Sequence, residues 1–284
     1  MSKKTETLKR ILRIPLWKLP HPRILFTIDS SEPEYKSEIA PLLEQFAAHQ
    51  IPVTLFVSNE TLSGRGNYPV IREICQFSER NGLPLEIASH GFRHHDLSGA
   101  DPRAVIEKIN ESVSDFDEKG FAVRGFRAPF LSIEDKYQDI LSAMRGHNGG
   151  IRYDSSTFFE SGLLTSFFHV VVRRKSPHNI GAMWELPISA LDDYHILKKK
   201  RRGDRFAYFY WAAATNIWIR RLNYCLLLFH PHIIGKHVSL LGTFLSFCRD
   251  RFRPEYFMTC SQLVNELDAL CTRTALSESD RKEA

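Results

Sequence analysis

The sequence predicts an α/β protein built around a mostly parallel sheet. Short apolar runs, with the length and composition of buried strands, alternate along the chain with longer segments whose apolar residues recur at helical spacing. The 284 residues are enough for one large domain or two small ones, and their composition is that of an ordinary globular protein. The sequence contains no internal repeat and no low-complexity block.

Polar residues directly follow several of the predicted strands. They are Asp29, His90, Arg127, Asp154 and His230. In parallel α/β folds and barrels the chemistry collects at the carboxyl ends of the strands. These clusters therefore predict one functional site at that edge of the sheet.

The N-terminal half is expected to alternate strand and helix. Asp101 and Pro102 favour a helix start, because a capping side chain is followed by proline in the first turn. The predicted elements are strands at 23–28, 52–57 and 85–88, and helices at 37–49, at 68–81 and from 101 to just before Gly120.

The C-terminal half continues the alternation around an irregular stretch at 157–203. The chain from Thr274 is polar and is expected to fray. The predicted elements are strands at 122–126, 151–153, 183–187, 224–229 and 255–258, a hairpin at 169–174, and helices at 134–145, at 206–222, at 238–252 and from Thr259 or Ser261 onward.

The charge pattern limits the range of partners. The net charge of +5 is mild, and much of it lies in short clusters such as 198–202 (KKKRR), not along one face suited to nucleic acid. We therefore expect no nucleic-acid partner. The 198–202 cluster is interpreted as a solvated loop or, alternatively, as a contact for an anionic surface or polymer.

Cysteine usage and the absence of targeting signals predict a cytoplasmic protein. The five cysteines form no C-x2-C pair, which favours a reducing compartment. The basic N-terminal segment lacks a long apolar core and a cleavage site, so no secretory signal is expected. The apolar stretch at 208–229 is interrupted by polar residues and is not expected to span a membrane. Peripheral contact with a membrane stays open.

A pair of histidines follows the third predicted strand. His90 and His94 are four residues apart and can meet on one side of a turn, close enough to share a divalent cation. Gly91 lets the backbone bend between them. The alternative is a surface loop that happens to be rich in histidine.

The order of four short motifs resembles the polysaccharide deacetylase family, carbohydrate esterase family 4, with its NodB-homology domain. The motifs are TIDS, SHGFRHH, RAPF and LLLFHPH, and the resemblance runs from about Arg23 to Leu270. The segment ELPISALDDY, followed by FHPHIIG, is most similar to the branch of peptidoglycan deacetylases and metal-independent allantoinases. The resemblance implies a distorted (β/α) barrel of about seven parallel strands. We expect a basic lead at 1–22, the catalytic domain at 23–272 and a polar tail at 273–284.

The resemblance also implies roles for the motif residues. In the family two histidines and an aspartate hold a divalent metal, usually zinc, which polarises the acyl carbonyl and acidifies bound water. A second aspartate acts as general base, and a histidine on the opposite side protonates the leaving amine. His90 and His94 take the metal positions and Asp29 is the carboxylate of the first motif. Arg127 orients that carboxylate, and His230 is the general acid.

The first motif departs from the family pattern. The family has two acidic residues there, whereas this chain has Asp29 followed by Ser30 and Ser31. If Asp29 is the base, the carboxylate ligand is missing; if Asp29 is the ligand, the base is missing. Glu32 is a nearby substitute. A site with two histidines and no carboxylate binds zinc more weakly.

Further residues are predicted to contact substrate, and each assignment has a structural alternative. Asp29 can cap a turn, Arg127 can brace a loop through an ion pair, and His230 can pack at a strand end. The predicted substrate-binding residues are Pro129, Phe130, Asp154 and Trp184; the alternatives are that Asp154 forms a turn and that Trp184 is buried.

Three functional hypotheses follow. The first is a hydrolase of non-peptide carbon–nitrogen bonds that removes acetyl from an N-acetylated saccharide or a lipid-linked sugar with the help of a divalent metal. The second is a metal-independent amide or ureide hydrolase of the allantoinase type. The third is a degenerate barrel that binds a saccharide without turning it over, which the Ser30 departure motivates.

Overall fold

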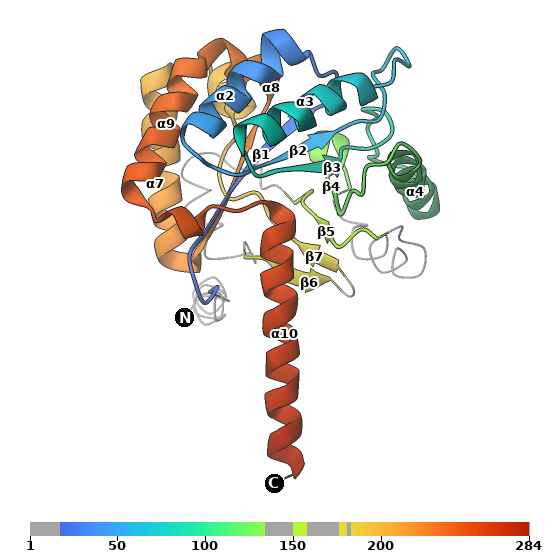
Figure 1. Cartoon of the computed structure of the whole chain (residues 1–284), viewed down its shortest axis with the longest axis vertical. Helices are drawn as coiled ribbons and strands as arrows, with labels where there is room; N and C mark the ends of the chain where they lie inside the picture. The colour runs from blue at the N-terminus through green and yellow to red at the C-terminus, as the bar shows by residue number, and fades with distance from the viewer. Residues whose placement is uncertain (1–17, 134–149, 158–175, 181–182, 284) are drawn as a thin grey trace, which may run out of the picture.

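The computed structural model describes residues 18–133, 150–157, 176–180 and 183–283. In this part of the chain the strands form an eight-stranded sheet in the order β6-β7-β5-β4-β3-β2-β1-β8 (Figure 1). Neighbouring strands are parallel except for β6, which is antiparallel to β7. The strands are β1 (Arg23–Ser30), β2 (Val53–Val57), β3 (Leu85–Ser89), β4 (Gly125–Phe126), β5 (Tyr153–Asp154), β6 (His178–Ile180), β7 (Met183–Glu185) and β8 (Tyr224–Phe229).

Helices cover the outside of the sheet. Helix α2 neighbours both α3 and α9, and α9 neighbours α7, so these helices form a continuous outer layer (Figure 1). The longer helices are α2 (Ala40–Ala48), α3 (Tyr68–Asn81), α4 (Pro102–Glu118), α7 (Asp204–Leu222), α9 (Val238–Arg251) and α10 (Cys260–Glu283). The shorter ones are η1 (Tyr35–Ile39), η2 (Pro129–Leu131), η3 (Tyr194–Lys199), α8 (Pro231–Ile234), η4 (Gly235–His237) and η5 (Pro254–Tyr256).

An irregular segment closes the sheet into a barrel. After β7 the chain reaches β8, where the backbone N–H of Ser189 donates to the carbonyl of Leu226 at 2.9 Å. The N–H of Leu226 in turn donates to Oγ of Ser189, and the Tyr224 hydroxyl donates to the carbonyl of Pro187. The seam between β7 and β8 is therefore made without a strand ladder. The predicted distorted barrel of about seven parallel strands is confirmed.

The core is built from strands that are apolar along their whole length. Strands β2 and β8 are buried at every residue, as expected for parallel strands covered on both faces. Phe26 of β1 packs its ring against Phe46 of α2, Phe229 of β8 and Phe244 of α9. One aromatic side chain thus joins the sheet to two of its covering helices.

Most predicted elements are confirmed. Helix α3 matches the prediction at both ends, with Gly82 in the left-handed conformation after its last residue. The side chain of Asp101 accepts a hydrogen bond from the backbone N–H of Arg103, so it caps α4 as expected. The predicted helix at 134–145 and hairpin at 169–174 lie outside the described residues.

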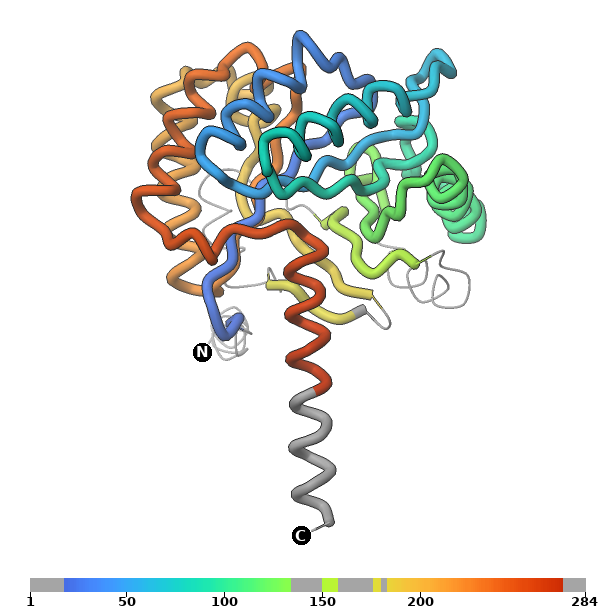
Figure 2. Tube along the Cα trace, viewed as in Figure 1, coloured from blue at the N-terminus to red at the C-terminus, as the bar shows by residue number. Residues whose placement is uncertain are grey.

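Three predictions need correction. The strand predicted at 255–258 is wrong: Pro254 starts a short turn, and only Phe257 bridges to β1, at Ile24. The same edge of β1 pairs with β2 from Thr27 onward, so a longer strand has no room there. Strand β4 begins at Gly125, not at 122. Helix α10 continues to Glu283, past the point at which the tail was expected to fray. Its coloured N-terminal part already leads away from the barrel (Figure 2).

None of the described helices has both the length and the apolar character needed to cross a bilayer.

Candidate active site

The carboxyl ends of four strands bring the motif residues to one pocket. Asp29 lies near the end of β1, His90 follows β3 and His230 follows β8. Together with His94 they line a pocket of about 780 Å³. Arg127, which follows β4, lies behind it and is completely buried. The prediction that these strand ends share one edge of the sheet is confirmed.

Arg127 holds Asp29 from the interior of the barrel. Its Nη1 donates to Oδ1 of Asp29 at 2.6 Å and to Oγ1 of Thr27 at 3.0 Å. Its other nitrogens donate to the carbonyl and hydroxyl of Ser155, and its guanidinium stacks 4.0 Å from the centre of the Phe56 ring. These four hydrogen bonds and the ring contact fix Arg127 in place.

This ion pair keeps Asp29 ionised. Burial on its own raises the pKa of the Asp29 carboxyl, but the charge of Arg127, with smaller contributions from His90 and His230, outweighs it. The pKa of Asp29 therefore lies below its usual value. At neutral pH the Asp29 carboxylate is therefore ionised, and it can accept protons and hydrogen bonds from molecules in the pocket.

The two histidines are held as neutral imidazoles. Nδ1 of His90 donates to the backbone carbonyl of Arg127 at 2.9 Å, which leaves its Nε2 as an acceptor. Burial lowers the pKa of His90, and burial together with the nearby His90 lowers the pKa of His94 to about 4. Their ring centres are 5.1 Å apart. Gly91 between them has a φ of +82°, and its N–H donates to Oγ of Ser89, so the loop turns sharply after His90.

His230 has the opposite electrostatics. Its Nδ1 donates to Oδ1 of Asp193 at 2.7 Å, and its backbone N–H donates to Oδ2 of the same carboxylate at 2.9 Å. Burial lowers the pKa of His230, but the completely buried Asp193 carboxylate outweighs this and raises it to about 9. His230 therefore carries a proton at neutral pH.

The rest of the pocket wall is partly aromatic and partly charged. The Phe130 ring lies 4.3 Å from the ring of His94, is 64% exposed and has a φ of +55°, a strained conformation for a bulky residue. The side chains of Glu34 and Glu38 line one part of the pocket. Tyr194 and its neighbours on η3 line another part, which includes Lys198 and Lys199.

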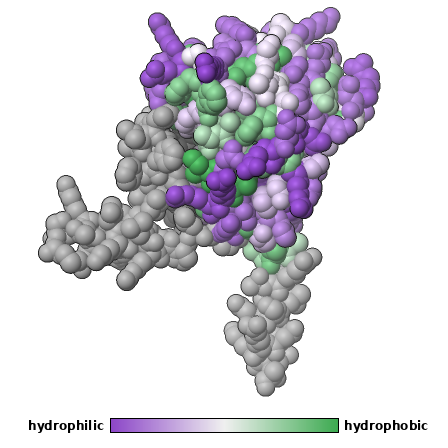
Figure 3. Space-filling model, turned by 90° about the vertical axis from the view of Figure 1, so that its left-hand side faces the viewer, coloured by the Kyte–Doolittle hydropathy of each residue, from purple (hydrophilic) through white to green (hydrophobic). Residues whose placement is uncertain are grey.

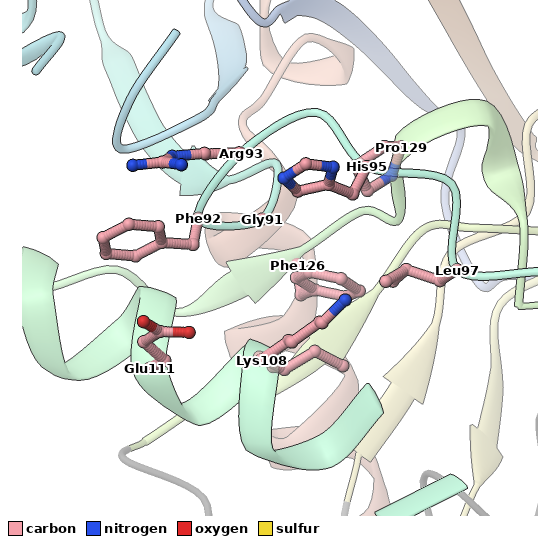
Figure 4. A pocket seen from close by; sticks show the side chains of 10 residues that line it. Gly91, Phe92, Arg93, His95, Leu97, Lys108, Glu111, Phe126 and Pro129 are labelled. Carbon is pink, nitrogen blue, oxygen red and sulfur yellow. The ribbon is translucent and has the colours of Figure 1, made fainter. Parts of the chain in front are cut away.

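Three of the predicted substrate-binding residues lie elsewhere. The Asp154 carboxylate is completely buried and accepts hydrogen bonds from the backbone N–H and the hydroxyl of Ser156, so it forms the turn after β5. Trp184 is 4% exposed and its indole N–H donates to Asp268 of α10. Pro129 lines a second pocket, of about 300 Å³, together with His95 (Figure 4). Of these four residues, Phe130 alone lines the Asp29 pocket.

The sequence reasoning missed Asp193. It lies in the ELPISALDDY segment, but its role depends on a contact with a residue 37 positions away. Tyr194 and His195 follow it and line the pocket. The usable signal was the pair of adjacent acidic residues at the end of an apolar run, since a buried carboxylate needs a cation as partner.

The residues present do not form the ligand set that the resemblance implies for zinc. Within the described ranges, no group of three or more His, Cys, Asp or Glu side chains is arranged to hold a metal ion. Oδ1 of Asp29 is engaged by Arg127, and the next position is Ser30, which also lines the pocket. A protein zinc site uses three or four protein ligands. His90 and His94 provide two.

The family model of polysaccharide deacetylases matches residues 18–147. No curated protein matches the chain.

Several solved structures have a similar fold. A Mycobacterium smegmatis protein assigned to the polysaccharide deacetylases has a TM-score of 0.65 at 21% identity, over 89% of this chain and 93% of that one. Puue allantoinase has a TM-score of 0.62 at 15% identity, over 89% and 94%. A carbohydrate esterase family 4 pseudoenzyme from Bacillus anthracis has a TM-score of 0.50 at 12% identity, over 86% and 66%.

These similarities show that the chain shares its fold with the two structures of higher TM-score. The family match covers the first three of the four motifs, and the barrel brings residues of all four together around one pocket. The chain is thus similar to polysaccharide deacetylases over residues 18–147, and it shares its fold with the solved structures named above.

Proposed function

We propose that this protein removes the acetyl group from an N-acetylated saccharide by hydrolysis of its amide bond. One observation carries the proposal. An ionised carboxylate, Asp29, and a protonated imidazole, His230, face the same pocket, and each is backed by a buried group of opposite charge. Amide hydrolysis needs such a pair, because water must lose a proton and the leaving amine must gain one.

Asp29 is the proposed general base and His230 the proposed general acid. Water attacks the acyl carbon while Asp29 takes its proton. The carbon–nitrogen bond then breaks as Nε2 of His230 donates a proton to the amine. Nε2 of His90 is unprotonated and can accept a hydrogen bond from the attacking water. The pairing of Asp29 with Arg127 supports the role of base for Asp29, because it holds the carboxylate in place and keeps it ionised.

A second candidate is a metal-independent amide or ureide hydrolase of the allantoinase type. The available metal ligands support this candidate, because among the described residues no third side chain joins His90 and His94 in a metal-binding group. The fold similarity to an allantoinase supports it as well. The two candidates share the acid–base pair and differ in substrate and in metal dependence, which stays a prediction.

The deciding experiment measures acetate release from N-acetylglucosamine oligomers and turnover of allantoin by the purified protein, before and after chelation. We expect acetate release, and His230→Gln to lower it by about 10²–10⁴-fold. His95→Gln is the matched control, because this histidine lines the other pocket. Turnover of allantoin alone would replace the first candidate by the second, and no turnover of either would indicate a non-catalytic saccharide binder.

The metal is tested separately by elemental analysis of the protein supplied with zinc, with His90→Ala alongside. One zinc per chain that is lost in the variant would establish metal binding by the histidines. Activity that survives chelation would assign the reaction to Asp29 and His230 without a metal.

A further inference from the structure

A surface next to the pocket combines clustered cations with exposed aromatic rings. We call it the basic–aromatic patch; it consists of Lys198, Lys199, Lys200, Arg201, Arg202, Arg205, Phe206 and Phe209, all exposed. Asp204 is the only acidic residue within this stretch of sequence, and its carboxylate pairs with His237 at 2.7 Å. The patch is therefore strongly positive.

The outward face of α7 is apolar where a surface helix is normally polar. Phe206 is 36% exposed and Phe209 57% exposed, and Ala213, one turn further, is exposed too. The spacing of three and four residues places these side chains on one stripe of the helix. Figure 3 looks at the side of the molecule on which α7 and α9 lie, where apolar residues are surrounded by hydrophilic ones.

The arginines of the patch lie against its aromatic rings. The guanidinium of Arg202 is 5.4 Å from the centre of the Phe206 ring, and that of Arg205 is 5.8 Å from the centre of the Phe209 ring. Stacking of nucleic-acid bases on these rings would have to displace the arginines. A lipid headgroup region accepts this arrangement as it is, because rings insert at the acyl boundary while guanidinium groups bind phosphates.

The patch is continuous with the mouth of the pocket. Lys198 and Lys199 belong to the patch and also line the pocket that contains Asp29 and His230. A surface bound by the patch is therefore close to the pocket opening.

We propose that the basic–aromatic patch docks the protein on the surface of an anionic lipid bilayer. Six cations give electrostatic attraction to acidic headgroups, and two phenylalanine rings add apolar insertion, so two independent signals act together. Docking presents the pocket to molecules carried in the headgroup layer. On the basis of the proposed deacetylation, the substrate class is then a saccharide linked to a lipid.

The test is co-sedimentation of the full-length chain with phosphatidylcholine vesicles that either contain or lack phosphatidylglycerol. We expect binding to the anionic vesicles, weakening with salt, and little binding to the neutral ones. The triple variant Arg201→Gln, Arg202→Gln, Arg205→Gln should weaken binding by about 100-fold, at about fivefold for each cation. None of these three residues lines the pocket, so hydrolysis of a soluble N-acetylated oligomer should be unchanged.

Two matched controls accompany the triple variant. Arg72→Gln, Arg80→Gln, Arg103→Gln removes three exposed cations from α3 and α4, and Leu62→Ser removes an exposed apolar side chain to match Phe209→Ser. Both controls should bind as the wild type does, and Phe209→Ser should bind more weakly.

Failure of the wild type to bind anionic vesicles, or equal losses in the patch and control variants, would overturn the proposal. Binding is read without any substrate, so this result is independent of whether the protein proves to be a deacetylase.

Discussion

The pocket has two ion pairs beside it, Asp29–Arg127 and Asp193–His230. In the first pair the carboxylate lines the pocket, and in the second pair the cation does. Asp29 lines the pocket and has the buried Arg127 behind it. On the other side His230 lines the pocket and has the buried Asp193 behind it. Both pairs are close, at 2.6 Å and 2.7 Å. The two pairs therefore have similar distances and differ in which of their charges lies at the pocket.

Under the proposed function, this difference explains how two similar ion pairs serve opposite proton transfers. The group in front keeps the charge that its partner stabilises: Asp29 stays unprotonated and His230 stays protonated. Each carboxylate needs its own cation, because a buried charge without a partner is costly. A substitution in the Asp29–Arg127 pair should therefore change the protonation of Asp29 and not that of His230, and a substitution in the His230–Asp193 pair should do the reverse.

Asp29→Asn should have the largest effect. The amide cannot take a proton from water, so kcat should fall by about 10³-fold or more in the acetate-release assay. Thr27→Val is the control, because it removes a hydrogen-bond acceptor of Arg127 but leaves the carboxylate in the pocket. A loss of less than tenfold in Asp29→Asn would show that Asp29 is not the base.

Asp193→Asn should change the pH profile on the acid side of the pair. His230 acts in its protonated form, so the rate should fall as pH rises through its pKa of about 9. Without the carboxylate that pKa should return to about 6.5 or lower, and the rate at pH 8 should drop about thirtyfold. The acidic limb, which belongs to Asp29, should not move.

Asp192→Asn sharpens this result. Asp192 accepts hydrogen bonds from His195 and not from His230, so its removal should move the basic limb much less. Equal shifts in the two variants would contradict the specific pairing of Asp193 with His230.

Ser30→Asp should strengthen metal binding. Ser30 lines the pocket together with His90 and His94, and a carboxylate there would supply the third ligand that the described residues lack. We expect zinc affinity to rise by at least about tenfold, measured by titration calorimetry against wild type. Ser31→Asp is the neighbouring control, and an equal gain there would point to added charge instead of coordination.

Trp184→Phe should have the smallest effect. The indole N–H binds Asp268 outside the pocket, so kcat should stay at the wild-type value while the free energy of unfolding falls by about 1 kcal/mol. Urea denaturation measures the second quantity. A large loss of kcat would return Trp184 to the substrate-binding residues.

Local sequence signals explain how much of the fold could be predicted. Helix α3 matches the predicted bounds at both ends, and Gly82, directly after its last residue, is a local signal for the end of a helix. Strand β6 and helix η3 were not predicted, since they lie in a stretch without clear periodicity and form through pairing with β7 and packing on other elements. The strand expected at 255–258 failed because β2 already occupies that edge of β1.

The candidate site divides in the same way. Asp29, His90 and His230 follow apolar runs directly, so their convergence was predictable once the strands were taken as parallel. Asp193 acts through a partner 37 residues away, and Trp184 is turned toward α10 by a contact that no local pattern encodes. The residues that line the pocket were thus predictable from the sequence, whereas the buried residues behind them depend on tertiary contacts.

The placement of β1 beside β8 has a mechanical consequence. These neighbouring strands carry Asp29 and precede His230, and their ladder runs from Arg23 paired with Tyr224 to Ile28 paired with Phe229. Strands β4 and β5 have two residues each, and the seam at Ser189 has no ladder at all. The spacing between the proposed base and the proposed acid is therefore set by the longest ladder of the described sheet. Substitutions in the segments around β4, β5 and Ser189 can then change which substrates fit, while the spacing between Asp29 and His230 stays the same.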